Sequence, residues 1–225
     1  MDKDAVYSTL DYTLLKQFAD KASIDALCKK ALEYKTASVC IPPSYVPYVR
    51  ETFPTLTICT VIGFPNGYNT KAVKVYETKE AIKDGADEID MVINITDVKN
   101  GLFDKVTDEI REIKKAAGDH ILKVIVETCF LTQEKKKAVC RCVSEAGADY
   151  IKTSTGFGTK GAEIEDITLF RENIDPGVKI KAAGGIRSLD SILAFLDRGA
   201  SRIGTSLDPE KLFVRSKECR LKLKT

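Results

Sequence analysis

Short apolar runs rich in β-branched residues alternate with longer amphipathic stretches along the whole 225-residue chain. The short runs predict eight strands, at Ser8 to Tyr12, Ala37 to Ile41, Thr57 to Ile62, Glu88 to Ile93, Ile121 to Glu127, Tyr150 to Thr153, Val178 to Ala182 and Arg202 to Thr205. The longer stretches have apolar residues three and four positions apart. They predict seven helices, at Ile24 to Tyr34, Lys71 to Lys83, Phe103 to Ala117, Thr132 to Ala146, Glu165 to Asn173, Leu189 to Arg198 and Pro209 to Leu221.

In two of these segments the pattern predicts which side chains are buried and which face water. In the helix predicted from Phe103, one apolar stripe joins Val106, Ile110 and Ile113. The charged residues between them are expected to face water; they are Asp108, Glu109, Arg111, Glu112 and Lys114. In the strand from Glu88 to Ile93, Asp87 and Glu88 are expected at the solvent-exposed start. Asp90 falls inside the apolar run, where a carboxylate needs a partner.

Strands that alternate with helices predict a parallel sheet with helical crossovers. Three helices are followed by a glycine turn before the next strand, at Gly85, Gly147 and Gly199, which suits a left-handed helix cap. This recurrence favours an α/β fold of the (β/α)8-barrel type, formed by residues 1–225 as one domain. The alternative, a doubly wound open sheet, predicts an early G-x-G-x-x-G turn, and the turn from Gly63 to Gly67 does not have that form.

Composition narrows the class of protein. The 35 basic and 33 acidic side chains are interspersed, so neither a nucleic-acid-binding stripe nor a polybasic membrane patch is expected. No apolar segment is long enough to span a bilayer, and the polar start predicts no secretory signal. Seven cysteines, an odd number, and a single histidine favour reduced thiols in the cytoplasm over disulfides or a metal site. A homodimer is compatible with the sequence.

Lys152 ends one of the apolar runs and is followed by small polar residues from Thr153 to Thr155. Burial disfavours the charged form of a lysine and exposes a neutral amine, which attacks carbonyl carbon. Lys181 occupies a similar position in the next predicted strand, and a second cation nearby would strengthen this effect. The alternative is an ordinary strand-end lysine that reaches solvent.

In a barrel of this type the carboxyl ends of the strands meet at one face, where the chemistry is placed. The polar residues at those ends are Asp11, Cys40, Asp90, Lys123, Lys152, Lys181 and the turn Gly204-Thr205-Ser206. Asp90 could be a proton-relaying carboxylate or a structural ion-pair partner, and the two roles are compatible. Cys40 could line the pocket or serve as a small core residue.

Glycine turns follow the last two predicted strands, at Gly184-Gly185 and at Gly204. In (β/α)8 barrels, backbone amides in these two loops often bind a phosphate group. Arg187 or Lys160 could add positive charge. The alternative is that these are ordinary turn glycines.

Seven segments together resemble the deoxyribose-phosphate aldolase family, in its short single-domain form. They occur in the family's order and spacing, nearly from end to end of the chain. These segments are Leu10 to Leu15, Ser38 to Pro42, Val61 to Gly67, Glu88 to Asn94, Leu122 to Thr128, Ile151 to Gly158 and Lys181 to Arg187.

The resemblance implies a (β/α)8-barrel class I aldolase that needs no metal or cofactor. Such enzymes reversibly cleave 2-deoxy-D-ribose 5-phosphate to acetaldehyde and D-glyceraldehyde 3-phosphate. It implies that Lys152 forms the Schiff base, that Lys181 activates it, and that Asp90 relays protons with Lys181 and a water. It implies that Asp11 and Lys123 line the pocket and that Gly185, Gly204, Thr205 and Ser206 lie in phosphate-binding turns. Cys40, Thr155 and Gly184 complete the set of predicted substrate-binding residues.

The chain departs from the family pattern where Leu207-Asp208 follows the last glycine turn, since a serine and a glycine are usual there. An aspartate at that turn is expected to repel a phosphate. Two other functions remain open: a Schiff-base aldolase with another aldehyde acceptor, and a catalytically silent barrel that binds a sugar phosphate or a partner. The buried amine argues against the silent barrel.

Overall fold

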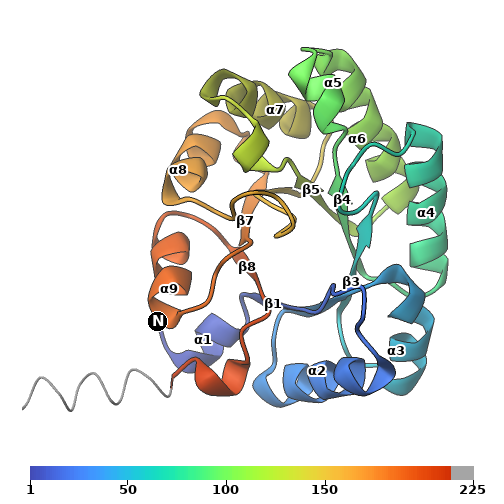
Figure 1. Ribbon diagram of the computed structural model, residues 1–225, viewed down its shortest axis with the longest axis vertical. Helices are drawn as coiled ribbons and strands as arrows, with labels where there is room; N and C mark the ends of the chain where they lie inside the picture. The colour runs from blue at the N-terminus through green and yellow to red at the C-terminus, as the bar shows by residue number, and fades with distance from the viewer. Residues whose placement is uncertain (214–225) are drawn as a thin grey trace, which may run out of the picture.

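The strands of the computed structural model, which describes residues 1–213, run parallel and close into a barrel because β8 pairs with β1 (Figure 1). The barrel strands lie in chain order, and each pairs with its neighbour in sequence. Their bounds are β1 Leu10–Thr13, β2 Ser38–Ile41, β3 Ile58–Ile62, β4 Glu88–Val92, β5 Ile121–Ile125, β6 Tyr150–Lys152, β7 Lys179–Ala183 and β8 Arg202–Thr205. The predicted (β/α)8 barrel is therefore confirmed.

Helices surround the barrel on its outer side (Figure 1). Six correspond to predicted helices: α2 Lys21–Tyr34, α4 Lys71–Lys83, α6 Phe103–Ala117, α7 Gln133–Glu145, α8 Ile164–Asn173 and α9 Leu189–Asp197. Three short helices were not predicted, namely α1 Lys3–Tyr7, α3 Val46–Thr52 and α5 Ile95–Lys99. A helix of one or two turns is too short to show the apolar period from which a helix is predicted.

Single 3₁₀ turns complete the described part of the chain: η1 Pro43–Tyr45, η2 Thr128–Phe130 and η3 Pro209–Lys211. The last of them occupies the start of the helix expected from Pro209 to Leu221. The remainder of that prediction extends past residue 213, outside the described residues. None of the helices in residues 1–213 has the length and apolarity to cross a membrane.

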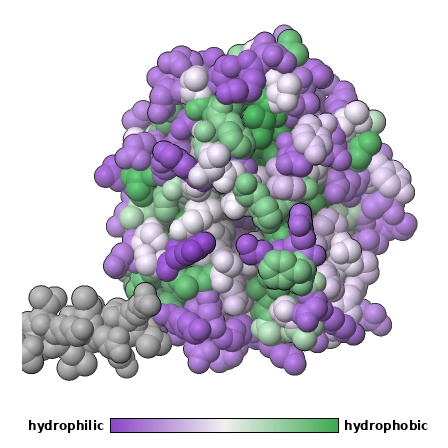
Figure 2. Space-filling model, viewed as in Figure 1, coloured by the Kyte–Doolittle hydropathy of each residue, from purple (hydrophilic) through white to green (hydrophobic). Residues whose placement is uncertain are grey.

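Alternate side chains of each strand face two different surroundings, as the pleat of a strand requires. On β4, Ile89 and Met91 belong to the apolar core between the strands and the outer helices. Glu88 and Asp90, on the other face, point into the barrel and are also buried. The strands therefore place apolar residues outside the barrel and charged residues within it. Viewed as in Figure 1, hydrophilic residues cover most of the rim formed by the outer helices (Figure 2).

As the sequence predicts, a glycine follows three of the helices in the turn that leads to the next strand. Gly85, Gly147 and Gly199 have φ angles of 106°, 72° and 111°, in the left-handed region that residues with a Cβ rarely adopt. Each turn brings the chain back from a helix to the start of the next strand.

Glu109 on α6 does not face water, contrary to the prediction from the charge pattern. Its carboxylate is buried against α4, where Lys74 Nζ donates to Glu109 Oε1 at 2.8 Å and to the Val92 carbonyl at 2.8 Å. The stripe of Val106, Ile110 and Ile113 is buried as predicted. The helical period alone assigned Glu109 to the wrong side because its partner comes from another helix.

We expect Lys74→Met to lower the free energy of unfolding by about 3 kcal/mol, because it leaves a buried carboxylate without its cation. Changing both partners, in Lys74→Met/Glu109→Leu, should recover most of that loss. Chemical denaturation measures both values.

Lys71 on the same helix is the matched control, since its ion pair with Asp108 is exposed. Lys71→Met should cost less than about 1 kcal/mol. Equal losses in the free energy of unfolding for Lys74→Met and Lys71→Met would show that the buried ion pair stabilises the fold no more than the exposed one.

Candidate active site

Asp90 is the centre of the charged cluster inside the barrel. Its Oδ2 accepts hydrogen bonds from Lys152 Nζ and from Lys181 Nζ, each at 2.6 Å, and its Oδ1 accepts one from Lys123 Nζ at 2.9 Å. Three strands, β5, β6 and β7, thus direct a lysine toward one carboxylate on β4. The strand register explains part of this arrangement, because Asp90 lies opposite Lys123 and Lys152 lies opposite Lys181.

Two lysines that share one carboxylate oxygen must lie close together. Burial opposes the charged form of Lys181, but Asp11 and Asp90 outweigh burial and raise its pKa above the usual value. Lys181 is therefore held as a cation. Lys152 therefore lies beside a fixed cation, and both amines donate to the same carboxylate oxygen.

Asp11 lies deeper than Lys152 and is fully buried. Its carboxylate forms ion pairs with Lys181 and Arg202, and it accepts a hydrogen bond from the Ser38 hydroxyl at 2.8 Å. Burial opposes the ionised form, but Lys181, Lys123 and Arg202 together hold the pKa of Asp11 below its usual range. Asp11 thus stays ionised and keeps Lys181 charged.

Glu88 does not lie at the solvent-exposed start of its strand, as the sequence suggested. It is only 4% exposed and points into the barrel, where Lys123 Nζ lies 2.6 Å and Arg202 2.7 Å from Glu88 Oε2. Glu88 and Asp90 are two residues apart and therefore share one face of β4. The sequence pattern did contain this signal, since the period of two that places Asp90 inside also places Glu88 inside.

Lys152 opens onto a cavity of about 180 Å³ formed by the loops after the last strands. Seven of the predicted site residues line it together: Lys152, Thr155, Gly184, Gly185, Gly204, Thr205 and Ser206. Arg187 and Lys16 line it as well and bring positive charge. The other five do not line the cavity. Asp90 and Lys181 lie behind Lys152 and bond to each other, while Asp11, Cys40 and Lys123 are fully buried.

Glu127, absent from the predicted site, anchors one wall of this cavity. It is buried just after β5, and its carboxylate accepts hydrogen bonds from the backbone N–H of Thr155, at 3.2 Å, and from the Thr155 hydroxyl. Thr155 Oγ1 in turn accepts from the Phe157 N–H at 3.0 Å. Burial raises the pKa of Glu127. An acid at the end of an apolar run was the available sequence signal.

The loop after β6 packs directly on the loop after β7. Ala162 donates its N–H to the carbonyls of Ala183 and Gly184, each at 3.1 Å. A Cβ atom on Gly161 would meet the Gly184 carbonyl oxygen at 2.1 Å, so only glycine permits this approach. The two loops that line the cavity are therefore joined through their backbones.

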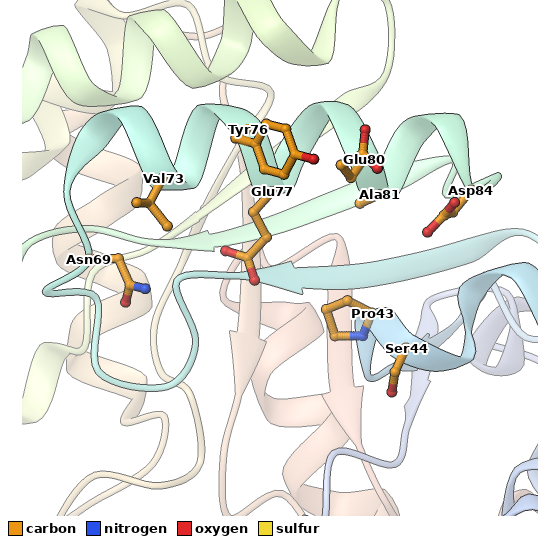
Figure 3. A pocket seen from close by; sticks show the side chains of 9 residues that line it. All are labelled: Pro43, Ser44, Asn69, Val73, Tyr76, Glu77, Glu80, Ala81 and Asp84. Atoms are coloured by element: carbon orange, nitrogen blue, oxygen red, sulfur yellow. The ribbon is translucent and has the colours of Figure 1, made fainter.

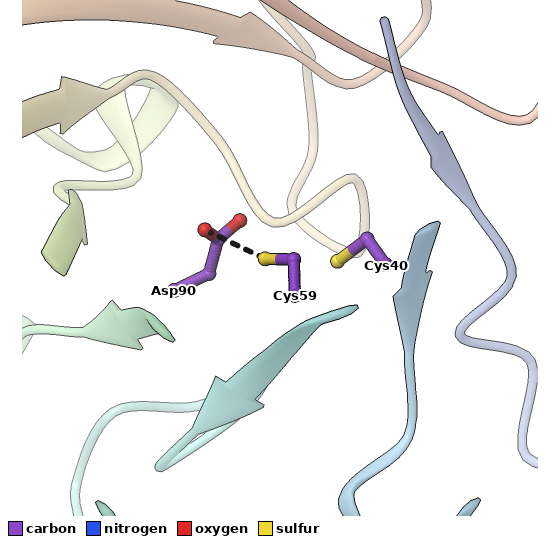
Figure 4. A group of neighbouring side chains, drawn as sticks. All are labelled: Cys40, Cys59 and Asp90. Atoms are coloured by element: carbon purple, nitrogen blue, oxygen red, sulfur yellow. Dashed lines mark hydrogen bonds between the residues drawn. The ribbon is translucent and has the colours of Figure 1, made fainter. Parts of the chain in front are cut away.

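Cys40, Cys59 and Asp90 form a group whose ligand atoms lie within 4.8 Å of one another (Figure 4). Cys59 Sγ donates to Asp90 Oδ1 at 3.2 Å and accepts from Lys123 Nζ at 3.3 Å. Burial raises the pKa of Cys59 well above its usual value, which keeps the thiol protonated. A metal ion prefers a thiolate, and here the Lys123 ammonium already supplies the positive charge. The group fits a metal poorly.

Asp208, which the sequence places just after the last glycine turn, does not line the cavity. Its carboxylate forms an ion pair with Lys30 on α2 and accepts the Glu210 N–H at 3.2 Å. A neighbouring cation compensates its charge. Asp208 takes this position because it caps the start of the 3₁₀ turn η3.

A larger cavity of about 430 Å³ lies outside the barrel, between α4 and η1 (Figure 3). Glu77, Glu80 and Asp84 line it together with Val73 and Tyr76, and within residues 1–213 none of its lining residues is a lysine.

A parallel barrel with a buried lysine cluster beside a cavity is an arrangement suited to an enzyme that acts on carbonyl compounds. Residues 9–206 match the DeoC/LacD family of aldolases, and the chain belongs to that family. The family resemblance drawn from the sequence motifs is thereby confirmed.

Curated relatives extend over nearly the whole chain. A deoxyribose-phosphate aldolase of Clostridium botulinum is 54% identical over 207 residues, which is 92% of this chain and 94% of the relative. One of Streptococcus pyogenes is 56% identical over 207 residues, 92% of this chain and 93% of the relative. Among solved structures, the tetrameric deoxyribose phosphate aldolase of Aeropyrum pernix matches with a TM-score of 0.87 at 28% identity, covering 97% of this chain and 93% of that one.

We expect Gly161→Ala to separate the two loops, because the added methyl group clashes with the Gly184 carbonyl. Overpacking of this kind should lower the free energy of unfolding by about 1–3 kcal/mol. Native-state hydrogen exchange should show faster exchange of the Ala162 amide.

Gly177→Ala is the control, since a Cβ there meets no atom within 4 Å. Its stability and the Ala162 exchange rate should stay at the level of the unmodified protein. Unchanged exchange in Gly161→Ala would contradict the close backbone contact.

Proposed function

We propose that this chain is a class I aldolase that reversibly cleaves 2-deoxy-D-ribose 5-phosphate to acetaldehyde and D-glyceraldehyde 3-phosphate. One observation carries the proposal: Lys152 opens onto the cavity while it shares the Asp90 carboxylate with Lys181. A neighbouring cationic group is one of the ways in which a Schiff-base lysine is activated. The names of the relatives supply the substrate.

Cleavage begins when the neutral Lys152 amine attacks the aldehyde carbon, C1, of the open-chain sugar. Loss of water leaves an iminium ion, which withdraws electrons from the C2–C3 bond. Removal of the proton from the C3 hydroxyl breaks that bond, and C3 leaves as the aldehyde of glyceraldehyde 3-phosphate. The electron pair stays on C2 as an enamine. Protonation of C2 and hydrolysis of the imine then release acetaldehyde.

Asp90 and Lys181 are positioned to move these protons. Asp90 faces both Lys152 and Lys181 through the same oxygen, so a proton leaving one amine has an acceptor adjacent to the other. We assign them the proton relay, together with a water molecule. Asp11 and Lys123 do not line the cavity. Asp11 pairs with Lys181 and Lys123 pairs with Asp90, so the two residues stabilise the charges of the relay.

The phosphate group belongs at the turns after β7 and β8. Gly184, Gly185, Gly204, Thr205 and Ser206 line the cavity there. Backbone N–H groups at such turns bind an anion without help from side chains, and glycine lets it approach closely. Arg187 lines the same part of the wall and adds a full positive charge.

We also propose a homodimer in a reducing compartment, the cytoplasm. Two-fold dimers are the commonest symmetric assemblies. The six cysteines in the described residues are free thiols, which suits a reducing environment. Light scattering would give the assembly.

Lys152→Arg should abolish cleavage of 2-deoxyribose 5-phosphate and the formation of an acetaldehyde adduct. Arginine keeps the positive charge but provides no free amine near neutral pH. Borohydride reduction with acetaldehyde, followed by mass spectrometry, should locate the adduct on Lys152 in the unmodified protein only.

Lys160→Arg is the matched control, because Lys160 is exposed and pairs with Glu163 on the surface. It should retain the adduct on Lys152 and full cleavage activity. An adduct in Lys152→Arg, or activity retained there, would refute the assignment of the nucleophile.

Arg187→Gln should raise the KM for the phosphorylated sugar about tenfold, equivalent to about 1.4 kcal/mol of lost binding. The KM for unphosphorylated 2-deoxyribose should change little, because that sugar presents no charge to Arg187. Asp208→Asn is the control, since Asp208 pairs with Lys30, and it should alter neither KM. Equal effects of Arg187→Gln on both sugars would place the phosphate elsewhere.

A further inference from the structure

Glu88 and Arg202 lie inside the barrel beneath the proposed catalytic residues. Arg202 forms ion pairs with Asp11 and with Glu88, the latter at 2.7 Å. Glu88 also faces Lys123 Nζ at 2.6 Å. Neither residue lines the cavity, and the reaction described above gives neither of them a task.

Two chains of contacts connect this pair to Lys152. One runs from Glu88 through Lys123, whose Nζ lies 2.9 Å from Asp90, and from Asp90 to Lys152 at 2.6 Å. The other runs from Arg202 through Asp11 to Lys181, which shares Asp90 Oδ2 with Lys152. Every link joins opposite charges in a buried setting, where electrostatic interactions are screened little.

The charges in this network do not cancel. Among the described residues, the cluster joined by these ion pairs comprises the cations Lys123, Lys152, Lys181 and Arg202 and the anions Asp11, Glu88 and Asp90. One positive charge is in excess. The cluster becomes neutral when a single lysine loses its proton, and Lys152 is the lysine that opens onto the cavity.

We propose that Glu88 and Arg202 are positioning residues that set, by their charges, the pH range in which Lys152 is a neutral nucleophile. The inference rests on the proposed function, since it concerns the same amine. A role in stability alone explains the pair less well, because apolar residues of similar volume usually fill a buried site at lower cost than an ion pair.

The signs follow from electrostatics. Glu88→Gln removes a negative charge, so the cationic form of Lys152 is stabilised less and adduct formation should begin at lower pH. Arg202→Met removes a positive charge, so the cationic form persists and adduct formation should begin at higher pH. At an effective dielectric constant of about 20, a unit charge about 10 Å away shifts a titration by about one pH unit.

Other titratable groups near Lys152 are the same in every variant. Cys40 on β2 and Cys59 on β3 face the cluster, and Glu127 lies after β5, where it accepts hydrogen bonds from Thr155. A comparison between variants therefore isolates the charges of Glu88 and Arg202.

The experiment measures the rate of acetaldehyde adduct formation against pH by borohydride trapping. It uses the unmodified chain, Glu88→Gln, Arg202→Met and the double variant Glu88→Gln/Arg202→Met. The single variants should shift the profile by about one pH unit in opposite directions. The double variant restores the excess of one charge and should return the profile to that of the unmodified chain.

Arg202→Lys and Glu88→Asp separate charge from geometry. Both change the shape of the barrel floor but keep its charge, so both should keep the original pH profile even where the rate falls. Circular dichroism verifies that each variant is folded. Should Arg202→Met not fold, Glu88→Gln against the double variant decides the question, because only charge balance predicts that the second change reverses the first.

The outcomes distinguish the two proposals. If the unmodified chain forms no adduct, the proposed function fails, whatever Glu88 and Arg202 do. If it forms the adduct but the single variants keep its pH profile, or shift it in the same direction, the inference is overturned and the aldolase proposal stands.

Discussion

The carboxylate of Asp90 accepts hydrogen bonds from three lysines inside the barrel, and the rest of the site depends on this interaction. A buried carboxylate without cations, or three buried ammonium groups without a carboxylate, would be too costly to keep charged. Their mutual pairing makes the cluster tolerable. It also places Lys152 beside the cationic Lys181, since both amines bind the same Asp90 oxygen.

Alternate side chains of each barrel strand face outward or inward, so the residues that stabilise the fold and the residues of the candidate site lie on opposite faces of the strands. Residues such as Ile89, Leu122 and Ile151 face outward and pack against the helices, where burial of apolar surface stabilises the fold. Asp90, Lys123 and Lys152, which follow them directly in sequence, face inward and carry charged side chains. Because the apolar layer stabilises the barrel from outside, the interior is available for a network of ion pairs. That network contains one more cation than anion.

The cavity is lined by the carboxyl ends of β1, β6, β7 and β8 and by the connections that follow them. The backbones of the loops after β6 and β7 touch at Gly161 and Gly184, and Glu127 holds Thr155 from the loop after β5. Lys152, at the end of β6, thus faces a wall that includes glycine-rich turns. Asp208, which the chain has where the family usually has a small residue, is turned toward Lys30 and away from this wall.

The sequence by itself determined the barrel, its strand and helix order, and the family, because hydrophobic periods and ordered motifs are local properties of the chain. It also singled out Lys152, Lys181 and Asp90 as polar residues within apolar runs. Only the tertiary structure decided which charges meet. Glu88 and Glu109 look exposed in the sequence, yet both are buried by partners more than 30 residues away, Lys123 and Lys74. Asp208 does not line the cavity, and its carboxylate pairs with Lys30, 178 positions distant. The cost of burying a charge depends on where its partner lies, and the folded chain sets that distance.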